Sequence, residues 1–175
     1  MENTETTTTT QDIVRLAHEG LVTSGVNFAV YLPDSVFYPL TQTLEADKTI
    51  QTVVCSREDE GIAIAAGAYL GGKVPVVLME SSGLGFSGLV LARTQLQRTP
   101  MLLLAGHSKT LGIHWDFFGA SRITGEGILQ GLGIPYVVVD DPANLNTFIK
   151  QAVVTMKGQK TAVGLVIPRY IMGGV

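Results

Sequence analysis

The sequence predicts a three-layer α/β fold, in which a doubly wound parallel sheet of six strands lies between two layers of helices. Short β-branched runs alternate along the chain with longer segments whose apolar residues recur at helical spacing. The runs are apolar on both faces, which is typical of a parallel sheet covered on both sides. We expect the polar, Thr-rich residues 1–11 to be a flexible leader and residues 12–175 to form one domain.

The six expected strands are short apolar runs bounded by turn-forming residues such as Gly, Pro, Asp and Ser. In chain order they cover residues 28–32, 49–55, 74–79, 101–105, 136–140 and 162–167. Ligands of such sheets bind beyond the carboxyl ends of the strands. We therefore expect the site among the loops at 33–35, 56–60, 80–85 and 106–121.

Each expected helix has a local reason to start or stop. The first begins at about residue 12 and ends at Gly25, and the second follows the turn at 33–35. A third, over 57–70, begins after Ser56, which can cap it together with Asp59 three residues on. Apolar spacing predicts the remaining helices over 85–97, 124–132 and 142–156.

Composition excludes several classes of protein. The net charge is −3 and no Lys/Arg cluster occurs, so neither nucleic acid nor an anionic membrane is an expected partner. No apolar run reaches the roughly 18 residues of a membrane span, and the N-terminus lacks the pattern of a secretory signal, so we expect a cytoplasmic protein. The single cysteine, Cys55, excludes an internal disulfide and a multi-thiolate metal site.

Two of the expected helices lack a polar face, namely the segments 61–70 and 85–92. A helix that is apolar all round is buried all round. It could be a deep core helix of a monomer or part of a subunit interface. We favour the interface because only 15% of the residues are charged, against about 25% in an average soluble domain.

Three polar segments are candidates for chemistry. The first is Ser56-Arg57-Glu58-Asp59-Glu60, where capping and the helix dipole explain the other polar residues better than Glu58, which could point into a pocket. The second is the segment 80–85, whose glycines would let the backbone approach a ligand, although it matches neither a Walker loop nor a dinucleotide motif. The third contains His107 and His114. Their spacing gives no metal site, which leaves an acid/base or substrate contact or an ordinary surface loop.

Together these segments resemble the pyrimidine-binding (PYR) domain of thiamine-diphosphate enzymes. The resemblance rests on residues 56–75 and on 77–85, Val-Leu-Met-Glu-Ser-Ser-Gly-Leu-Gly. Its Ser-Gly-Leu-Gly portion is similar to a loop of sulfopyruvate and phosphonopyruvate decarboxylases. Residues 32–35 resemble the loop after their first strand, and residues 132–136 resemble the entry to their fifth strand.

The resemblance implies roles for particular residues. Glu58, nine residues before Gly67, matches the carboxylate that hydrogen-bonds N1′ of the cofactor's pyrimidine and favours its imino tautomer. Asp34 matches a position near the reacting carbons, which makes it a proton-relay candidate. The residues expected to line the cofactor are Ser82, Gly83, Leu84 and Gly85. His114 is a further catalytic candidate.

The substrate is less well defined by this resemblance. His107 and Arg122, with Lys109 nearby, are candidates to bind a 2-oxo acid carrying a distal sulfonate or phosphonate. The aromatic run within 115–118 fits a different 2-oxo acid equally well.

The resemblance also implies a partner. The family's diphosphate half contains Gly-Asp-Gly, which holds Mg²⁺, and this sequence has none. We therefore expect the PYR (alpha) subunit of a hetero-oligomeric thiamine-diphosphate-dependent 2-oxo acid decarboxylase, self-associating and paired with a diphosphate-binding (beta) subunit that holds Mg²⁺. The alternatives are a catalytically silent interaction subunit, a carboligase subunit acting on another 2-oxo acid, and a free-standing flavodoxin-like binding domain.

Overall fold

The computed structural model describes residues 9–107 and 119–172, and within them it confirms the predicted fold class. Six strands form one sheet in the order β2-β1-β3-β4-β6-β5, with every pairing parallel. The strands are β1 (Phe28–Tyr31), β2 (Gln51–Val54), β3 (Pro75–Glu80), β4 (Leu102–His107), β5 (Tyr136–Val138) and β6 (Val163–Pro168). The helices are α1 (Thr10–Thr23), α2 (Tyr38–Ala46), α3 (Glu58–Leu70), α4 (Gly83–Gln97), α5 (Gly119–Gly131) and α6 (Leu145–Gln159), with short 3₁₀ turns η2 (Pro142–Asn144) and η3 (Arg169–Met172).

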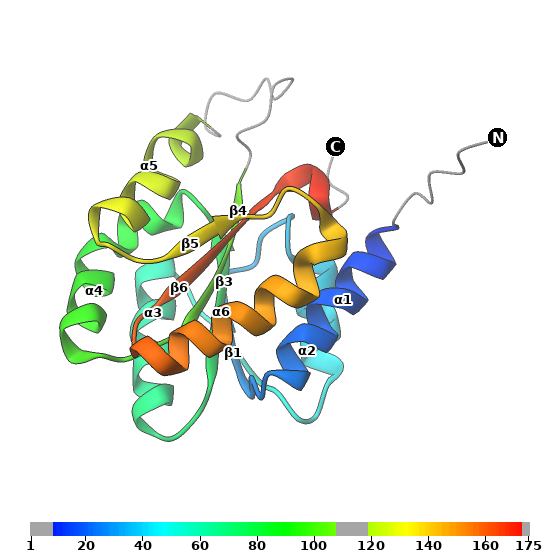
Figure 1. The fold of residues 1–175 in the computed structure, drawn as a ribbon, viewed down its shortest axis with the longest axis horizontal. Coiled ribbons are helices and arrows are strands. Elements are labelled where there is room, and N and C mark those ends of the chain that lie inside the picture. Colours follow the sequence, from blue (N-terminus) through cyan, green and yellow to red (C-terminus); the bar gives the residue numbers. More distant parts are fainter. Residues whose placement is uncertain (1–8, 108–118, 173–175) are drawn as a thin grey trace.

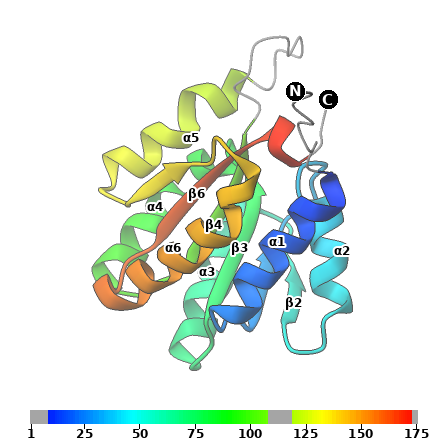
Figure 2. The ribbon, with the colours of Figure 1, turned by 45° about the vertical axis from the view of Figure 1, so that its right-hand side comes forward.

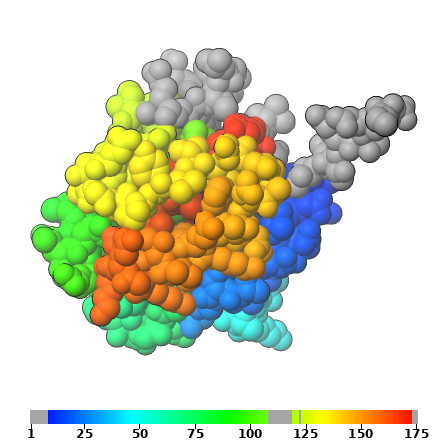
Figure 3. Space-filling view, in the orientation of Figure 1, coloured from blue at the N-terminus to red at the C-terminus, as the bar shows by residue number. Residues whose placement is uncertain are grey.

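The helices divide between the two faces of the sheet (Figures 1 and 2). α1, α2 and α6 cover one face, and α3, α4 and α5 cover the other. Alternate strand residues feed the two cores, so Leu78 packs in the first and Val77 in the second. Side chains of α6, of α1 and of the region around β5 hide the strands on one side of the molecule (Figure 3).

The differences from the predicted boundaries have local causes. α1 begins two residues early because Thr9 and Asp12 form a capping box, in which the Asp12 N–H donates to Thr9 Oγ1 over 3.2 Å. β2 and β5 are shorter than predicted, and both are edge strands paired on one side only. α5 begins at Gly119, inside the predicted loop, because the small residues 119–121 continue the helix without contributing to its apolar pattern.

The central strands account for much of the buried apolar surface. We expect Leu104→Ala, at a fully buried position of β4, to lower the free energy of unfolding by about 2–5 kcal/mol, because it leaves a cavity. Leu96→Ala in α4 is the matched control, since that side chain is 86% exposed and its loss should change stability by no more than about 0.5 kcal/mol. Urea unfolding of the isolated chain carrying each variant measures both effects. Equal losses would contradict the described core.

None of the helices in the described part of the chain is both long and apolar enough to cross a membrane.

Candidate functional site

The sheet reverses its winding direction between β1 and β3, because the chain passes from β1 outward to β2 and then returns to β3. Such a switch point opens a crevice at the carboxyl ends of the two strands. The loop after β1 carries Asp34, and β3 ends at Glu80. β4 ends beside it with His107, which pairs in register with Pro168 of β6, directly before Arg169. The ends of four neighbouring strands thus bring two acidic residues and two basic residues to one edge of the sheet, namely Asp34, Glu80, His107 and Arg169.

Glu58 is the first residue of α3, at this same edge. Two other carboxylates share its helical turn, and both serve local structure: Asp59 accepts hydrogen bonds from the Arg57 guanidinium at 2.9 and 3.1 Å, and Glu60 accepts from the Ser56 N–H at 2.7 Å. The predicted cap by Ser56 and Asp59 is therefore wrong, because Arg57 occupies the extended N-cap position and Glu60 reaches back instead. Glu58 makes no hydrogen bond within the described residues, so its carboxyl group remains available to a ligand.

Gly83, the first residue of α4, lies directly against Glu58. A Cβ atom at position 83 would come within 2.8 Å of Glu58 Cβ and 2.7 Å of its Cδ, which are distances that real side chains do not reach. Rotating the Glu58 side chain would not remove the contact with its Cβ. Glycine at position 83 is therefore required for Glu58 to occupy this place.

Part of the predicted 80–85 loop is helical, because Ser82 is the N-cap residue of α4 and Gly83, Leu84 and Gly85 form its first turn. Ser82 donates from its backbone N–H to Glu80 Oε2 over 2.7 Å, and its hydroxyl donates to the same oxygen. Leu84 is fully buried in the core and its N–H donates to the Ser81 carbonyl over 3.2 Å, so its side chain does not face a ligand. Gly85 is exposed and faces Thr124 of α5, where an added Cβ would come within 3.3 Å of the Thr124 Cβ.

Asp34 has one oxygen engaged and one free of protein partners. Its Oδ1 accepts hydrogen bonds from the backbone N–H groups of Val36 (2.6 Å) and Phe37 (2.9 Å), while its buried Oδ2 has no hydrogen-bond partner within the described structure. Burial raises the pKa of Asp34, and the negative charge of Glu80 raises it further, against the lowering effect of the two N–H donors and of Arg169. A buried carboxyl with an orphaned oxygen and a raised pKa is suited to exchanging a proton with a bound molecule.

The remaining predicted residues are only partly placed. His107 is a buried residue at the end of β4. His114 and Lys109 lie outside the described residues, as does the side chain of Arg122, whose backbone belongs to α5. No group of three or more possible metal-ligating residues occurs within the described ranges.

Two residues of this edge, Glu80 and Arg169, have no predicted role in the sequence. Glu80 accepts hydrogen bonds from Ser82 and, through its other oxygen, from the hydroxyl of Ser121 in α5. Arg169 directly follows the last strand, so applying the carboxyl-end rule to that strand would have found it.

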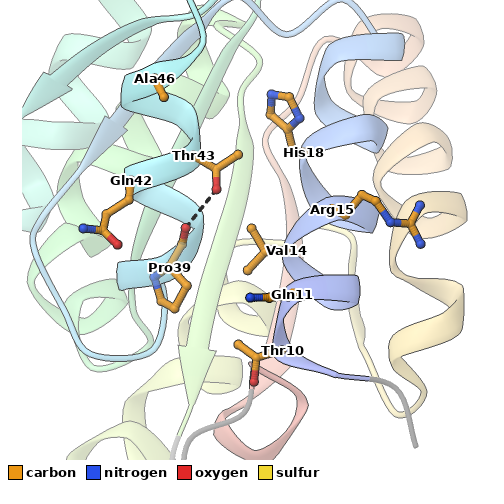
Figure 4. Close-up of a pocket in the computed structure, with 9 residues that line it drawn as sticks. All are labelled: Thr10, Gln11, Val14, Arg15, His18, Pro39, Gln42, Thr43 and Ala46. Carbon is orange, nitrogen blue, oxygen red and sulfur yellow. Dashed lines mark hydrogen bonds between the residues drawn. The ribbon is translucent and has the colours of Figure 1, made fainter. Parts of the chain in front are cut away.

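A separate groove of about 560 Å³ lies between α1 and α2 (Figure 4). Val14, Pro39 and Ala46 form part of its wall, and His18 lies at its upper end in Figure 4, where its Nε2 is 2.7 Å from Oδ2 of Asp47. Hydrogen bonds from Thr49, with that from His18, lower the pKa of Asp47 to about 2. The groove belongs to the α1/α2/α6 layer and contains none of the predicted site residues.

The chain is similar to known proteins over most of its length. The family model described as "Thiamine pyrophosphate enzyme, N-terminal TPP binding domain" matches residues 11–130. The chain belongs to this thiamine pyrophosphate enzyme family. The predicted resemblance to a PYR domain is thereby confirmed.

Relatives within the thiamine pyrophosphate family are similar over most of their length. The chain is 35% identical over 137 residues to sulfopyruvate decarboxylase subunit alpha of Methanothermobacter thermautotrophicus, covering 75% of this chain and 81% of the relative. The protein of the same name in Methanococcus maripaludis is 30% identical over 139 residues, covering 77% of this chain and 81% of the relative.

A solved structure of a 2-oxoglutarate:ferredoxin oxidoreductase from Magnetococcus marinus has a TM-score of 0.71 with this chain at 14% identity. The match covers 91% of this chain but 29% of the other, so the chain spans less than a third of that protein. It supports the fold alone.

The residues of this chain fit one end of thiamine pyrophosphate, its aminopyrimidine. Glu58 offers a carboxyl group with no hydrogen-bond partner among residues 9–107 and 119–172, and Gly83 leaves room for its side chain. Asp34 contributes a buried oxygen that has no hydrogen-bond partner in the described part of the chain. The diphosphate end needs a cation and its carboxylate ligands, and the described residues contain no such group.

Proposed function

We propose that this chain is the pyrimidine-binding alpha subunit of a thiamine-diphosphate-dependent decarboxylase of 2-oxo acids, of the sulfopyruvate and phosphonopyruvate type. The observation that carries the proposal is the Glu58–Gly83 contact. Of the three carboxylates in its turn, Glu58 alone has no role in the local structure, and a glycine across from it makes room for its side chain. The family match and the sulfopyruvate decarboxylase relatives support the same assignment.

Glu58 would hold a proton against a ring nitrogen of the aminopyrimidine. A carboxyl group does this well where water is excluded, because an unscreened hydrogen bond polarises the ring more strongly than one in water. When bound, thiamine diphosphate supplies the carbanion that attacks the keto carbon and the electron sink that lets CO₂ leave. The contribution of the protein is to orient that group and to set the protonation of one nitrogen.

Asp34 would act on the substrate side of the same crevice. Its unpartnered Oδ2 would donate a proton to, or accept one from, the substrate-derived carbon and oxygen atoms. His107 at the end of β4 and Arg169 after β6 lie at the same edge of the sheet as Asp34. The cation of Arg169 would bind a substrate carboxylate there. His114 stays a predicted catalytic residue and Arg122 a predicted substrate-binding residue, both on the resemblance of the sequence.

The partner would cover the outer surface of α3, α4 and α5. The exposed large apolar side chains of this layer are Leu70, Phe86, Leu89, Leu96 and Ile123. The Arg57 guanidinium lies 5.5 Å from the centroid of the Phe86 ring, which joins the Glu58 turn to this surface. An apolar surface of this extent beside a half-built site fits association with a diphosphate-binding chain that holds Mg²⁺, and with a second copy of this chain.

We expect Leu89→Asp to prevent assembly while leaving the isolated chain folded. Leu89 is 68% exposed on α4, so a charge there costs little in the free chain but would have to be desolvated in an interface. Val154→Asp is the matched control, because Val154 is 72% exposed on α6 in the opposite layer. Size-exclusion chromatography with light scattering reads the assembly. Equal behaviour of the two variants would exclude α4 from the interface.

The activity itself is tested by CO₂ release. The complex isolated from its own cells, supplied with thiamine diphosphate and Mg²⁺, should decarboxylate sulfopyruvate or phosphonopyruvate and release the matching aldehyde. A ligated product instead of an aldehyde would identify the carboligase alternative. No turnover of any 2-oxo acid by a cofactor-loaded complex would identify a silent subunit and refute the proposal.

A further inference from the structure

Glu80 is a carboxylate whose hydrogen bonds join separate segments of the site. It is the last residue of β3 and only partly buried. Its Oε2 accepts from the N–H and the hydroxyl of Ser82, directly before α4, and its Oε1 accepts from the hydroxyl of Ser121 in α5. Three donors converge on this one side chain.

The segment that Glu80 holds determines where Glu58 can lie. Ser82 precedes Gly83, and the Glu58 side chain packs against Gly83 so closely that not even a methyl group would fit between them. A shift of a few tenths of an ångström in this turn would therefore either press on the Glu58 side chain or leave it unsupported. The hydrogen bonds of Glu80 go to Ser82 and Ser121 rather than to Glu58, so its effect on Glu58 passes through the 82–83 turn.

The residues around the hydrogen-bonded Glu80 side chain are closely packed. Ser81 is fully buried, its N–H donates to the Gly106 carbonyl over 2.6 Å, and its side chain faces Gly125 of α5, where an added Cβ would come within 3.1 Å. The segment before α4 is thus fixed by the backbone hydrogen bond of Ser81 to β4 and by the close packing of its side chain against α5. Glu80 provides the hydrogen bonds that orient its N-terminal end.

We propose that Glu80 is a positioning residue of the cofactor site, which holds the 82–83 turn and thereby the Glu58 carboxyl group in the place where it can meet the aminopyrimidine. This inference rests on the proposed function. A carboxylate accepts at both oxygens, whereas a glutamine keeps one acceptor oxygen and must turn its NH₂ group toward the Ser82 N–H, or toward the Ser121 hydroxyl, which would then have to accept instead of donate. The charge also strengthens each bond.

Glu80→Gln is the isosteric test, and it has a readout in the free chain. In the wild-type chain, NMR should show the Ser82 amide proton shifted downfield by its short bond to the carboxylate, and Glu80→Gln should move the Ser82 and Gly83 amide signals. Ser121→Ala removes the α5 bond alone and should move them less. Glu45→Gln is the matched control, because Glu45 also accepts a hydrogen bond, from the Tyr31 hydroxyl, but lies in α2 in the opposite helix layer. It should leave both signals in place.

The decisive readout is the affinity of the complex for thiamine diphosphate, measured by calorimetry. Glu80→Gln should weaken binding about tenfold, the effect of a damaged charge-assisted hydrogen bond, whereas Glu45→Gln should not. Equal affinity in wild type and Glu80→Gln would overturn the positioning role. If Glu80→Gln does not fold, Ser121→Ala must still weaken binding measurably, and unchanged affinity would overturn the inference. No binding by the wild-type complex would instead refute the proposed function.

Discussion

Glu58→Gln is expected to slow decarboxylation by about a hundredfold or more while the protein still folds and assembles. The amide keeps the shape of the side chain, so its packing against Gly83 is preserved. It cannot exchange a proton with a ring nitrogen as a carboxyl group does. The measurement is the turnover number of the cofactor-loaded complex at saturating 2-oxo acid.

The neighbouring carboxylates provide the control for this variant. Glu60→Gln alters the bond to the Ser56 N–H, and Asp59→Asn alters the pair with Arg57, so each should change helix stability by about 1 kcal/mol or less and turnover little. A comparable loss of turnover in all three variants would mean that turnover depends on the total negative charge of the turn and not on Glu58 in particular. Unchanged turnover in Glu58→Gln would refute its assignment.

Gly83→Ala should damage the site without touching any polar group. The added methyl group overlaps Glu58 at its Cβ and Cδ atoms, so either α3 or α4 must shift at its first residue. We expect about 1–3 kcal/mol of destabilisation from overpacking and a large loss of turnover, because Glu58 leaves its position. Thermal unfolding and turnover of the complex measure the two effects.

Gly158→Ala is the matched control for Gly83→Ala. Gly158 lies in helix α6 in the opposite layer, is exposed, and would place its new Cβ in open space. Alanine in an exposed helix interior is favoured over glycine by roughly 0.5–1 kcal/mol, so this variant should be slightly more stable and fully active. Full activity of Gly83→Ala would show that Glu58 does not need its present position.

Much of the fold was predictable because the strands of a buried parallel sheet are nearly continuous apolar runs. The prediction failed where neighbours decide a boundary, as at the edge strands β2 and β5 and at the start of α5. Glu58 stood out in the sequence because its turn contained more carboxylates than helix capping needs. In the structure neither Ser56 nor Asp59 caps the helix: Arg57 takes the extended N-cap position without a side-chain cap, and Glu60 accepts from the Ser56 N–H.

The contacts that complete the site join segments far apart in the sequence. Gly83 lies 25 positions after Glu58 along the chain, and Ser121 lies 41 positions after Glu80. Glu80 itself looks in the sequence like the end of an ordinary strand. Its hydrogen bonds to Ser82 and Ser121 can be recognised only when α4 and α5 are packed side by side, as they are in Figure 1.

The measurement that tests the account most directly is native mass spectrometry of the complex isolated from its own cells through a tag on this chain. The account predicts a hetero-oligomer that contains this chain of 18.6 kDa and a second, diphosphate-binding chain, and that carries thiamine diphosphate and Mg²⁺. A smaller fraction of the Gly83→Ala complex should carry thiamine diphosphate. A monomer or homo-oligomer without cofactor would contradict the account, and Glu58 would then be one more acidic residue at a helix N-terminus.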